Sequence, residues 1–225
     1  KKKIGIKKNK ILSFLIDQKN NIWIEFSGVL QRLKRRRGLR NFYPGIIDSY
    51  IYSIFQDKQE RIWITSDNGI FYFSRGQLVN YTPQTGTDNI KFSGTILPNQ
   101  NILLANNEGV YEVSANTLEI VRHTPFRQTI HSIENIFISS GGEIFLLTGI
   151  NGIIYYLPSF QSQPVPLKNK FTGNIFQLIE LDGEGIPGAG CGGLIWFRRG
   201  WVGDQGVEGL GLAQTAGGHK GDGGG

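Results

Sequence analysis

Short apolar runs separated by polar turns repeat along most of this chain. Each run contains a large apolar residue at an equivalent position, and successive positions are 40, 40, 42 and 41 residues apart. These positions are Trp23, Trp63, Leu103, Phe145 and Ile186. A glycine before a second apolar run follows each of them, namely Gly28, Gly69, Gly109, Gly152 and Gly193. A period near 40 residues without helical patterning is typical of β-propeller blades.

The second repeat shows best how one unit folds. Its strands are predicted where β-branched and aromatic residues concentrate, at 51–56, 61–65, 70–73 and 77–81. Asn68 and Gly69 predict a tight hairpin between the two middle strands, because this pair accepts the positive φ angles of such a turn. Asp17 and Asp57 recur directly after a first strand, and we interpret them as turn caps whose side chains bond the local backbone.

We therefore expect an all-β fold, a β-propeller fragment of four to five four-stranded blades with a period of about 40 residues. The blades are expected at about 10–45, 46–85, 86–127 and 128–168, with a partial blade at 169–182. Stacked blades cover each other's faces, so Trp23, Trp63 and Phe145 are interpreted as packing between neighbours. A ring of five, closed by Ile4 to Ile6, is an alternative, but we favour a fragment of a larger ring.

Composition changes at about Gly183. Residues 183–225 contain 17 of the 31 glycines and are expected to form an irregular Gly-rich tail. Pro187 falls where the fifth blade needs its second strand, although 193–197 resembles a third strand. The tail is interpreted either as a flexible linker or as translation out of frame, and we favour the second.

Charge is unevenly distributed along the chain. Residues 1–40 hold 13 Lys or Arg and 2 acidic residues, a charge of +11, whereas the remainder holds 11 and 16, a charge of −5. We interpret the basic run at 34–37 as a solvated hairpin tip, with contact to a polyanion as the alternative. The basic run has no aromatic residues interleaved for base stacking, so no nucleic-acid partner is expected.

No enzymatic or metal-binding motif emerges from the sequence. His123, His131 and His219 are scattered, and Cys191 is the only cysteine, so no metal site, internal disulfide or catalytic residue is predicted. Residues 183–188 fit the spacing G-x-G-x-x-G, but Pro187 and the glycines around it exclude the helix that a dinucleotide site requires. We therefore expect no cofactor.

Propellers bind ligands on an axial face, where the loops between second and third strands meet the loops between blades. The residues predicted there are polar or aromatic, a composition that suits sugar hydroxyls. The candidate ligand-binding residues are Tyr50, Asp67, Asn68, Asn107, Glu108, His131 and Asn151.

The repeat resembles that of the two-component regulator propeller family, with the pattern I-x-x-I-x-x-D-x-x-G-x-I-W-I-G-T-x-x-G-L. The second repeat matches at Ile51, Ile54, Asp57, the run 62–64 and Gly69. The first repeat matches at Ile11, Phe14, Asp17, the run 22–24 and Gly28. The glycine after the aspartate is replaced by Asn21 and by Glu60, and the third and fourth repeats lose the tryptophan.

This resemblance implies a non-enzymatic sensor segment of an extracytoplasmic, periplasmic two-component regulator. Its implied partners are oligosaccharides and the remaining propeller blades of a parent protein, and any kinase would lie outside this chain. No membrane segment or signal peptide is visible here. The chain contains no methionine, so we expect its ends to be other than natural ones. A propeller enzyme, such as a lyase or hydrolase, and a protein-interaction scaffold are the alternative functions.

Overall fold

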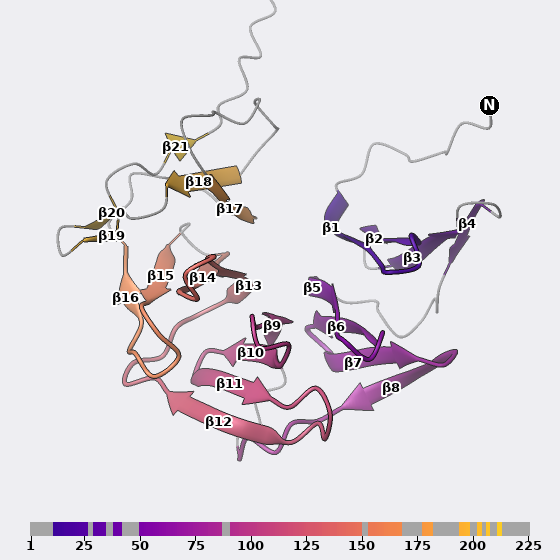
Figure 1. The fold of residues 1–225 in the computed structure, drawn as a ribbon, viewed down its shortest axis with the longest axis horizontal. Helices are drawn as coiled ribbons and strands as arrows, with labels where there is room; N and C mark the ends of the chain where they lie inside the picture. Colours follow the sequence, from indigo (N-terminus) through magenta and orange to yellow (C-terminus); the bar gives the residue numbers. More distant parts are fainter. Residues whose placement is uncertain are drawn as a thin grey trace, which may run out of the picture.

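The computed structural model describes residues 11–26, 29–34, 38–41, 50–86, 91–149 and 153–167, together with short strands at 177–181, 194–198, 202–203, 206–207 and 211–212. All regular elements in these ranges are strands. Four sheets of four strands lie around a common axis in an open arc (Figure 1). These sheets confirm the prediction of an all-β propeller with at least four blades. The described part of the chain contains no helix that could cross a membrane.

Each blade is an antiparallel sheet whose strands follow chain order from the axis outward (Figure 1). The first blade consists of β1 (Ile11–Ile16), β2 (Ile22–Phe26), β3 (Val29–Lys34) and β4 (Gly38–Asn41). The second consists of β5 (Ile51–Gln56), β6 (Ile62–Ser66), β7 (Gly69–Ser74) and β8 (Gln77–Tyr81). The third consists of β9 (Ser93–Ile96), β10 (Ile102–Asn106), β11 (Gly109–Val113) and β12 (Ile120–Pro125). The fourth consists of β13 (Ile133–Ile138), β14 (Ile144–Thr148), β15 (Ile154–Leu157) and β16 (Val165–Pro166).

The turn between the first and second strands has the same backbone geometry in every blade. In each blade, the residue after the first strand donates its backbone N–H to the carbonyl oxygen of the residue four positions later. Its own carbonyl oxygen accepts the N–H of the residue three positions later. The residues three positions into these turns have positive φ angles: Asn20, Glu60, Gln100 and Gly142. Asn20, not Asn21, therefore occupies the glycine position of the family pattern. Only Gly142 avoids the steric cost of this left-handed conformation.

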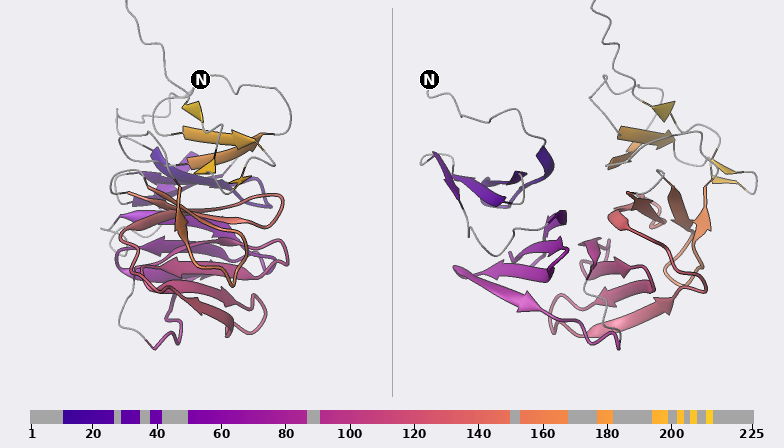
Figure 2. Two further views of the ribbon diagram at one scale, coloured as in Figure 1. Left: turned by 90° about the vertical axis from the view of Figure 1, so that its left-hand side faces the viewer. Right: turned by 180° about the vertical axis from the view of Figure 1, so that it is seen from behind.

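Apolar side chains between neighbouring sheets form the core. Trp23 of the first blade packs in a cluster with β5, β6 and β7 of the second. Trp63 of the second blade is fully buried and packs against Phe92, Ile102 and Tyr111 of the third. Phe145 is also buried and lies against Phe137 and Tyr156. The views in Figure 2 show the sheets stacked side by side, so each blade covers the face of the next.

The two tryptophans also donate hydrogen bonds to the turns. The indole Nε1 of Trp23 donates to Asp17 Oδ2 and that of Trp63 to Asp57 Oδ2, both at 2.8 Å. The other carboxylate oxygen caps the turn: Asp57 Oδ1 accepts the N–H groups of Gln59 and Arg61. The expected turn-capping role of both aspartates is confirmed. The indole bond, which pairs a buried carboxylate with a buried donor, was not predicted from the sequence.

The glycines that follow the large apolar residues of the repeats are required for different local reasons. Gly69 has a φ of +117°, which only glycine adopts without strain. A Cβ at Gly109 would lie 2.7 Å from the carbonyl oxygen of Thr124 and 2.8 Å from Nε2 of His123. Gly28 and Gly152 lie outside the described residues, as do Ile4 to Ile6, residues 35–37 of the basic run, and Ile186 and Pro187 of the tail.

The backbone after residue 176 departs from the blade pattern. β17 (Gln177–Leu181) pairs directly and in parallel with β18 (Leu194–Arg198), which also pairs with β21 (Gly211–Leu212). A first and a third strand of a blade run in this same relative direction, but a second strand separates them in the four blades above. Two further short strands, β19 (Val202–Gly203) and β20 (Gly206–Val207), form a separate antiparallel pair.

Candidate functional site

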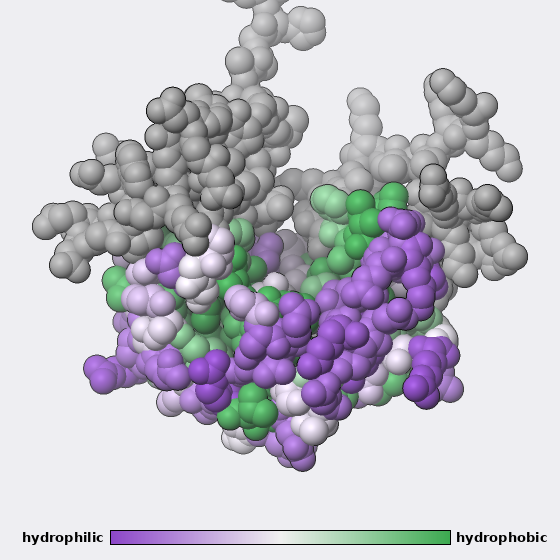
Figure 3. Space-filling view, viewed as in Figure 1, coloured by the Kyte–Doolittle hydropathy of each residue, from purple (hydrophilic) through white to green (hydrophobic). Residues whose placement is uncertain are grey.

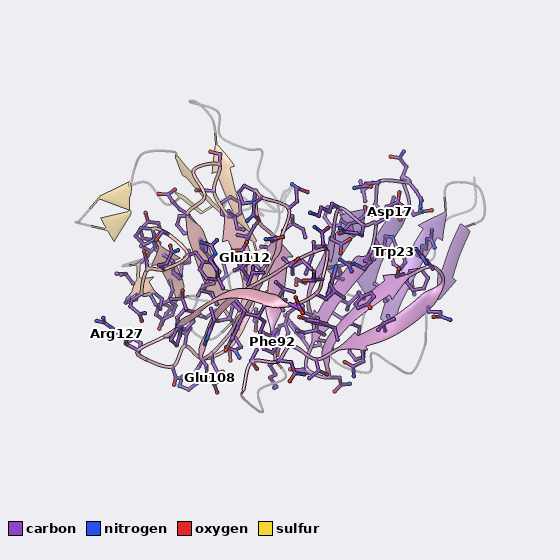
Figure 4. The ribbon with its side chains drawn as sticks, turned by 60° about the horizontal axis from the view of Figure 1, so that its bottom comes forward. Asp17, Trp23, Phe92, Glu108, Glu112 and Arg127 are labelled. Atoms are coloured by element: carbon purple, nitrogen blue, oxygen red, sulfur yellow. The ribbon has the colours of Figure 1, made fainter. Side chains whose placement is uncertain are left out.

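The blades have two chemically different axial ends. The turns that contain Asp17 and Asp57 lie at one end, which we call the turn end. The hairpins β6–β7 and β10–β11 lie at the other, together with the segments that lead into β5, β9 and β13. Figure 4 shows the separation: Asp17 and Glu112 lie toward one end, and Phe92 and Glu108 toward the other. The right-hand view of Figure 2 looks onto the hairpin end.

An open cavity of about 260 Å³, which we call the hollow, lies at the hairpin end. Three blades contribute to its wall through hairpins and through the segments before innermost strands. Its lining residues are Tyr52, Lys91, Asn106, Asn107, His131, Ser132 and Ile133. Most of these side chains carry hydrogen-bonding groups, so the hollow offers donors and acceptors beside an aromatic ring.

A chain of polar contacts fixes the wall that the second blade provides. The hydroxyl of Tyr52 donates to Asp67 Oδ1 at 2.5 Å, and Lys91 Nζ lies 3.1 Å from the same oxygen. Burial alone would raise the pKa of Asp67, but the hydrogen bonds from Tyr52 and Lys91 outweigh it and lower that pKa. Burial and the hydrogen bond to Asp67 raise the pKa of the Tyr52 hydroxyl. Asp67 is thus held ionised and Tyr52 protonated.

A second carboxyl group lies behind this wall. Glu134 of β13 accepts a hydrogen bond from Tyr50, whose ring lies 5.4 Å from that of Tyr52. Burial raises the pKa of Glu134, and the charge of Asp67 adds to the effect. A Cβ at Gly149 would lie 1.7 Å from Glu134 Oε1, so this carboxyl packs directly on the backbone of the fourth blade. Two carboxyl groups with opposite pKa shifts therefore adjoin the hollow.

Backbone hydrogen bonds hold the loops of the third and fourth blades in place. Asn106 Oδ1 accepts the N–H groups of Glu108 and Gly109, at 2.9 and 3.0 Å, and so shapes the β10–β11 hairpin. The carbonyl oxygen of Asn107 accepts the N–H of Ile130, just before the segment that carries His131. The wall of the hollow is consequently organised by the protein's own contacts.

The structure brings four of the seven candidate binding residues together. Asn107 and His131 line the hollow, while Asp67 and Tyr50 support it from behind through Tyr52 and Glu134. Asn68 and Glu108 are exposed at the hairpin tips and do not line the hollow. Asn151 lies outside the described residues.

Six residues of the site were not predicted from the sequence: Tyr52, Lys91, Asn106, Ser132, Ile133 and Glu134. Tyr52 and Glu134 lie in strands, where the pattern favours structural roles. Asn106 is the last residue of its strand, and a polar residue there was a signal that could have been followed. In the part of the chain that the structure describes, no group of three or more His, Cys, Asp or Glu residues could hold a metal ion.

Comparison with known proteins identifies a family match for the second repeat. Residues 45–68 match the family model for the two component regulator propeller, which confirms the resemblance for this repeat. No curated protein matches the chain in sequence.

Solved structures share the propeller fold at low sequence identity. The extracellular domain of a hybrid two component system from B. thetaiotaomicron has a TM-score of 0.60 at 13% identity, over 78% of this chain and 25% of that one. A catalytically inactive virginiamycin B lyase from Staphylococcus aureus, solved with quinupristin, has a TM-score of 0.58 at 13% identity, over 74% and 58%. An auxiliary nutrient binding protein from Bacteroides thetaiotaomicron has a TM-score of 0.55 at 12% identity, over 74% and 46%.

These similarities show the fold alone. The chain spans little more than half of the lyase and a quarter of the extracellular two-component domain. The propeller fold hosts both sensors and enzymes, so the chemistry of the hollow must distinguish between them.

Proposed function

We propose that this chain is a non-enzymatic, ligand-binding segment of an extracytoplasmic two-component sensor, and that it binds an oligosaccharide in the hollow. The observation that carries the proposal is the convergence of three blades on one polar cavity, which Asn107, His131 and Tyr52 line together. Amide and hydroxyl groups beside an aromatic ring match the hydroxyls and apolar faces of a sugar.

The carboxyl groups of the site support binding rather than turnover. Asp67 already accepts hydrogen bonds from Tyr52 and Lys91, and Glu134 accepts one from Tyr50. Both groups therefore hold the wall of the hollow in place. Such internal support is the arrangement that a preorganised binding site needs.

The proposal places the chain in a larger parent protein with further blades, in the periplasm or another extracytoplasmic location. Phe14 and Ile16 of β1 support it, because these large apolar side chains are 64% and 58% exposed on the innermost strand of the first blade. Figure 3 shows hydrophobic surface around this strand. A neighbouring blade would cover such surface, as blades two to four cover one another.

A propeller lyase or hydrolase is the second candidate. His131, Lys91 and Tyr52 line the same hollow and could exchange protons with a substrate there. A lyase with a similar fold is consistent with this alternative but does not favour it, because the identity is only 13%.

Titration calorimetry with the whole chain tests the proposal. The probes are malto-, cello-, xylo- and mannooligosaccharides and oligogalacturonides. We expect at least one series to bind, and Asn107→Ala and His131→Ala to weaken that binding by roughly 10-fold or more. Arg127→Ala is the matched control, because Arg127 is exposed at the hairpin end but does not line the hollow.

Three outcomes separate the candidates. Binding that survives both hollow substitutions would place the site elsewhere. Absence of binding across all five probe series would contradict oligosaccharide recognition. Chromatographic detection of cleaved probe, abolished by His131→Ala, would favour the enzyme instead.

A further inference from the structure

Asn106 at the floor of the hollow has a donor for which the fold supplies no well-formed hydrogen bond within the described residues. Its side chain is 1% exposed and lines the cavity. Both backbone N–H groups that it caps bind Oδ1, which fixes the orientation of the amide. The opposite atom, Nδ2, is buried and has no hydrogen-bond partner within the described part of the chain. A buried donor without a partner is uncommon in proteins and requires an explanation.

The equivalent positions of neighbouring blades show that the turn does not need this donor. Ser66 ends β6 and caps its own hairpin: its Oγ donates to the carbonyl of Gly69 and accepts the N–H of Asn68. Thr148 ends β14 and donates to the carbonyl of Ile153 at 2.9 Å. In both blades a single hydroxyl serves the turn. Asparagine in the third blade adds an amino group beyond that requirement.

A second unsatisfied group lies beside Asn106. The hydroxyl of Tyr111, a residue that is 1% exposed, lies close enough to the Asn106 amide for that side chain to oppose the rise of its pKa, but neither this hydroxyl nor Asn106 Nδ2 has a partner at full hydrogen-bond geometry within the described part of the chain. Burial raises the pKa of this hydroxyl, so it stays protonated and can both donate and accept. The pair therefore offers the N–H groups of the amide and a hydroxyl that can donate or accept to an oxygen atom that enters from the hollow.

We propose that Asn106 is a specificity-determining residue of the hollow: its Nδ2 donates a hydrogen bond to a hydroxyl oxygen of the bound sugar, and the Tyr111 hydroxyl is the second partner of that oxygen. This inference rests on the proposed oligosaccharide binding. Because Nδ2 is covered, the oxygen reaches it only when side chains at the floor of the hollow shift slightly. A ligand that lacks the hydroxyl leaves both protein groups unpaired, which is the strongest source of discrimination in polar sites.

The test compares Asn106→Ser and Tyr111→Phe with the unaltered chain, by calorimetry against the five oligosaccharide series named above. Asn106→Ser gives the third blade the turn cap of the second and removes the donor. Tyr111→Phe keeps the ring in the core and removes only the hydroxyl. We expect Asn106→Ser to weaken binding by roughly 10- to 100-fold and Tyr111→Phe by a smaller factor, with near-unchanged thermal unfolding. Arg127→Ala, at an exposed residue of the hairpin end that does not line the hollow, is again the control and should leave affinity unchanged.

The outcomes distinguish this inference from the proposed function. If no series binds the unaltered chain, the proposed function fails. If a series binds and Asn106→Ser and Tyr111→Phe both bind it equally well, the hollow binds sugar without Asn106 and the inference is overturned. A crystal structure of the complex gives an independent reading: a sugar oxygen on Asn106 Nδ2 supports the inference, and an ordered water there in place of the sugar overturns it.

Discussion

The two axial ends of the same blades differ in how their polar groups are hydrogen-bonded. At the turn end, charged groups are closed off by local partners, and Figure 3, which looks onto this end, shows a hydrophilic surface over the second blade. At the hairpin end, Asp67, Glu134 and Lys91 come from three blades, and Nδ2 of the Asn106 amide and the Tyr111 hydroxyl have no partner at full hydrogen-bond geometry among the described residues. The comparison indicates that one end stabilises the stack while the other retains chemistry for a ligand.

At the turn end, both carboxylate oxygens of Asp57 accept several hydrogen bonds. Its Oδ1 accepts two backbone N–H groups, and its Oδ2 accepts bonds from Arg61 Nε at 2.5 Å and Trp63 Nε1 at 2.8 Å. Arg61 also donates to the carbonyl of Ala115 and so links the second blade to the third.

The largest expected effect comes from breaking this network. Asp57→Ala leaves the indole and guanidinium donors buried without their acceptor, so we expect the free energy of unfolding to fall by about 3–5 kcal/mol. Urea denaturation followed by tryptophan fluorescence measures the loss. Lys58→Ala, in the exposed part of the same turn, is the control and should change stability by less than about 0.5 kcal/mol. A loss below about 1 kcal/mol for Asp57→Ala would show that the turn end is not the stabilising end.

A double-mutant cycle isolates the bond between turn and core. Trp63→Phe removes the indole N–H and keeps an aromatic ring. Combined with Asp57→Ala, it should cost less than the sum of the single changes, with a coupling energy of about 1–2 kcal/mol. Strict additivity in urea denaturation would mean that the 2.8 Å contact contributes nothing to stability.

Removal of the charge of Glu134, at the hairpin end, should have the opposite effect on stability. Burial raises the folded-state pKa of Glu134, so the stability that its protonated form contributes is complete below the ordinary carboxyl pKa and is lost as pH rises through the folded-state value. Glu134→Gln cannot ionise, and we expect it to raise the free energy of unfolding near pH 8 by up to about 1 kcal/mol. The gain should disappear near pH 3, where the glutamate is protonated in both states.

Asp67→Asn is the matched control for that prediction. The pKa of Asp67 is lowered in the folded chain, so its contribution is present above the ordinary aspartate pKa and is lost as pH falls through the folded-state value. This variant should therefore lose stability at neutral pH and little in acid. Equal pH profiles for the two variants would contradict the opposite pKa shifts.

The smallest expected effect concerns the strained turn residues. Gln100 has a φ of +67° and its side chain is exposed, so Gln100→Gly relieves a left-handed conformation without removing a buried contact. We expect thermal unfolding to show a gain of about 0.5–1 kcal/mol. Lys58→Gly, at a turn position without positive φ, should instead lose stability.

Local features of the fold were predictable because they repeat within a few residues. Runs of β-branched and aromatic residues between polar turns indicated the strands, and Asp57 with the polar residues after it indicated the capped turn. Asn68 and Gly69 indicated the hairpin. The indole bond was less accessible: it joins residues six positions apart, but it exists only because the burial of Trp63 by the third blade places its N–H beside the carboxylate.

The sequence alone determined that this chain forms blades, with the large apolar residues buried and the loops polar, because these properties follow from a short-range pattern repeated every 40 residues or so. Only the tertiary structure decided which loop residues share a site. Tyr52, Asn106 and Glu134 belong to three different blades, and their positions relative to one another depend on how those blades twist and stack. Periodicity establishes that such residues are equivalent along the chain, but the packing of neighbouring sheets determines which of them meet.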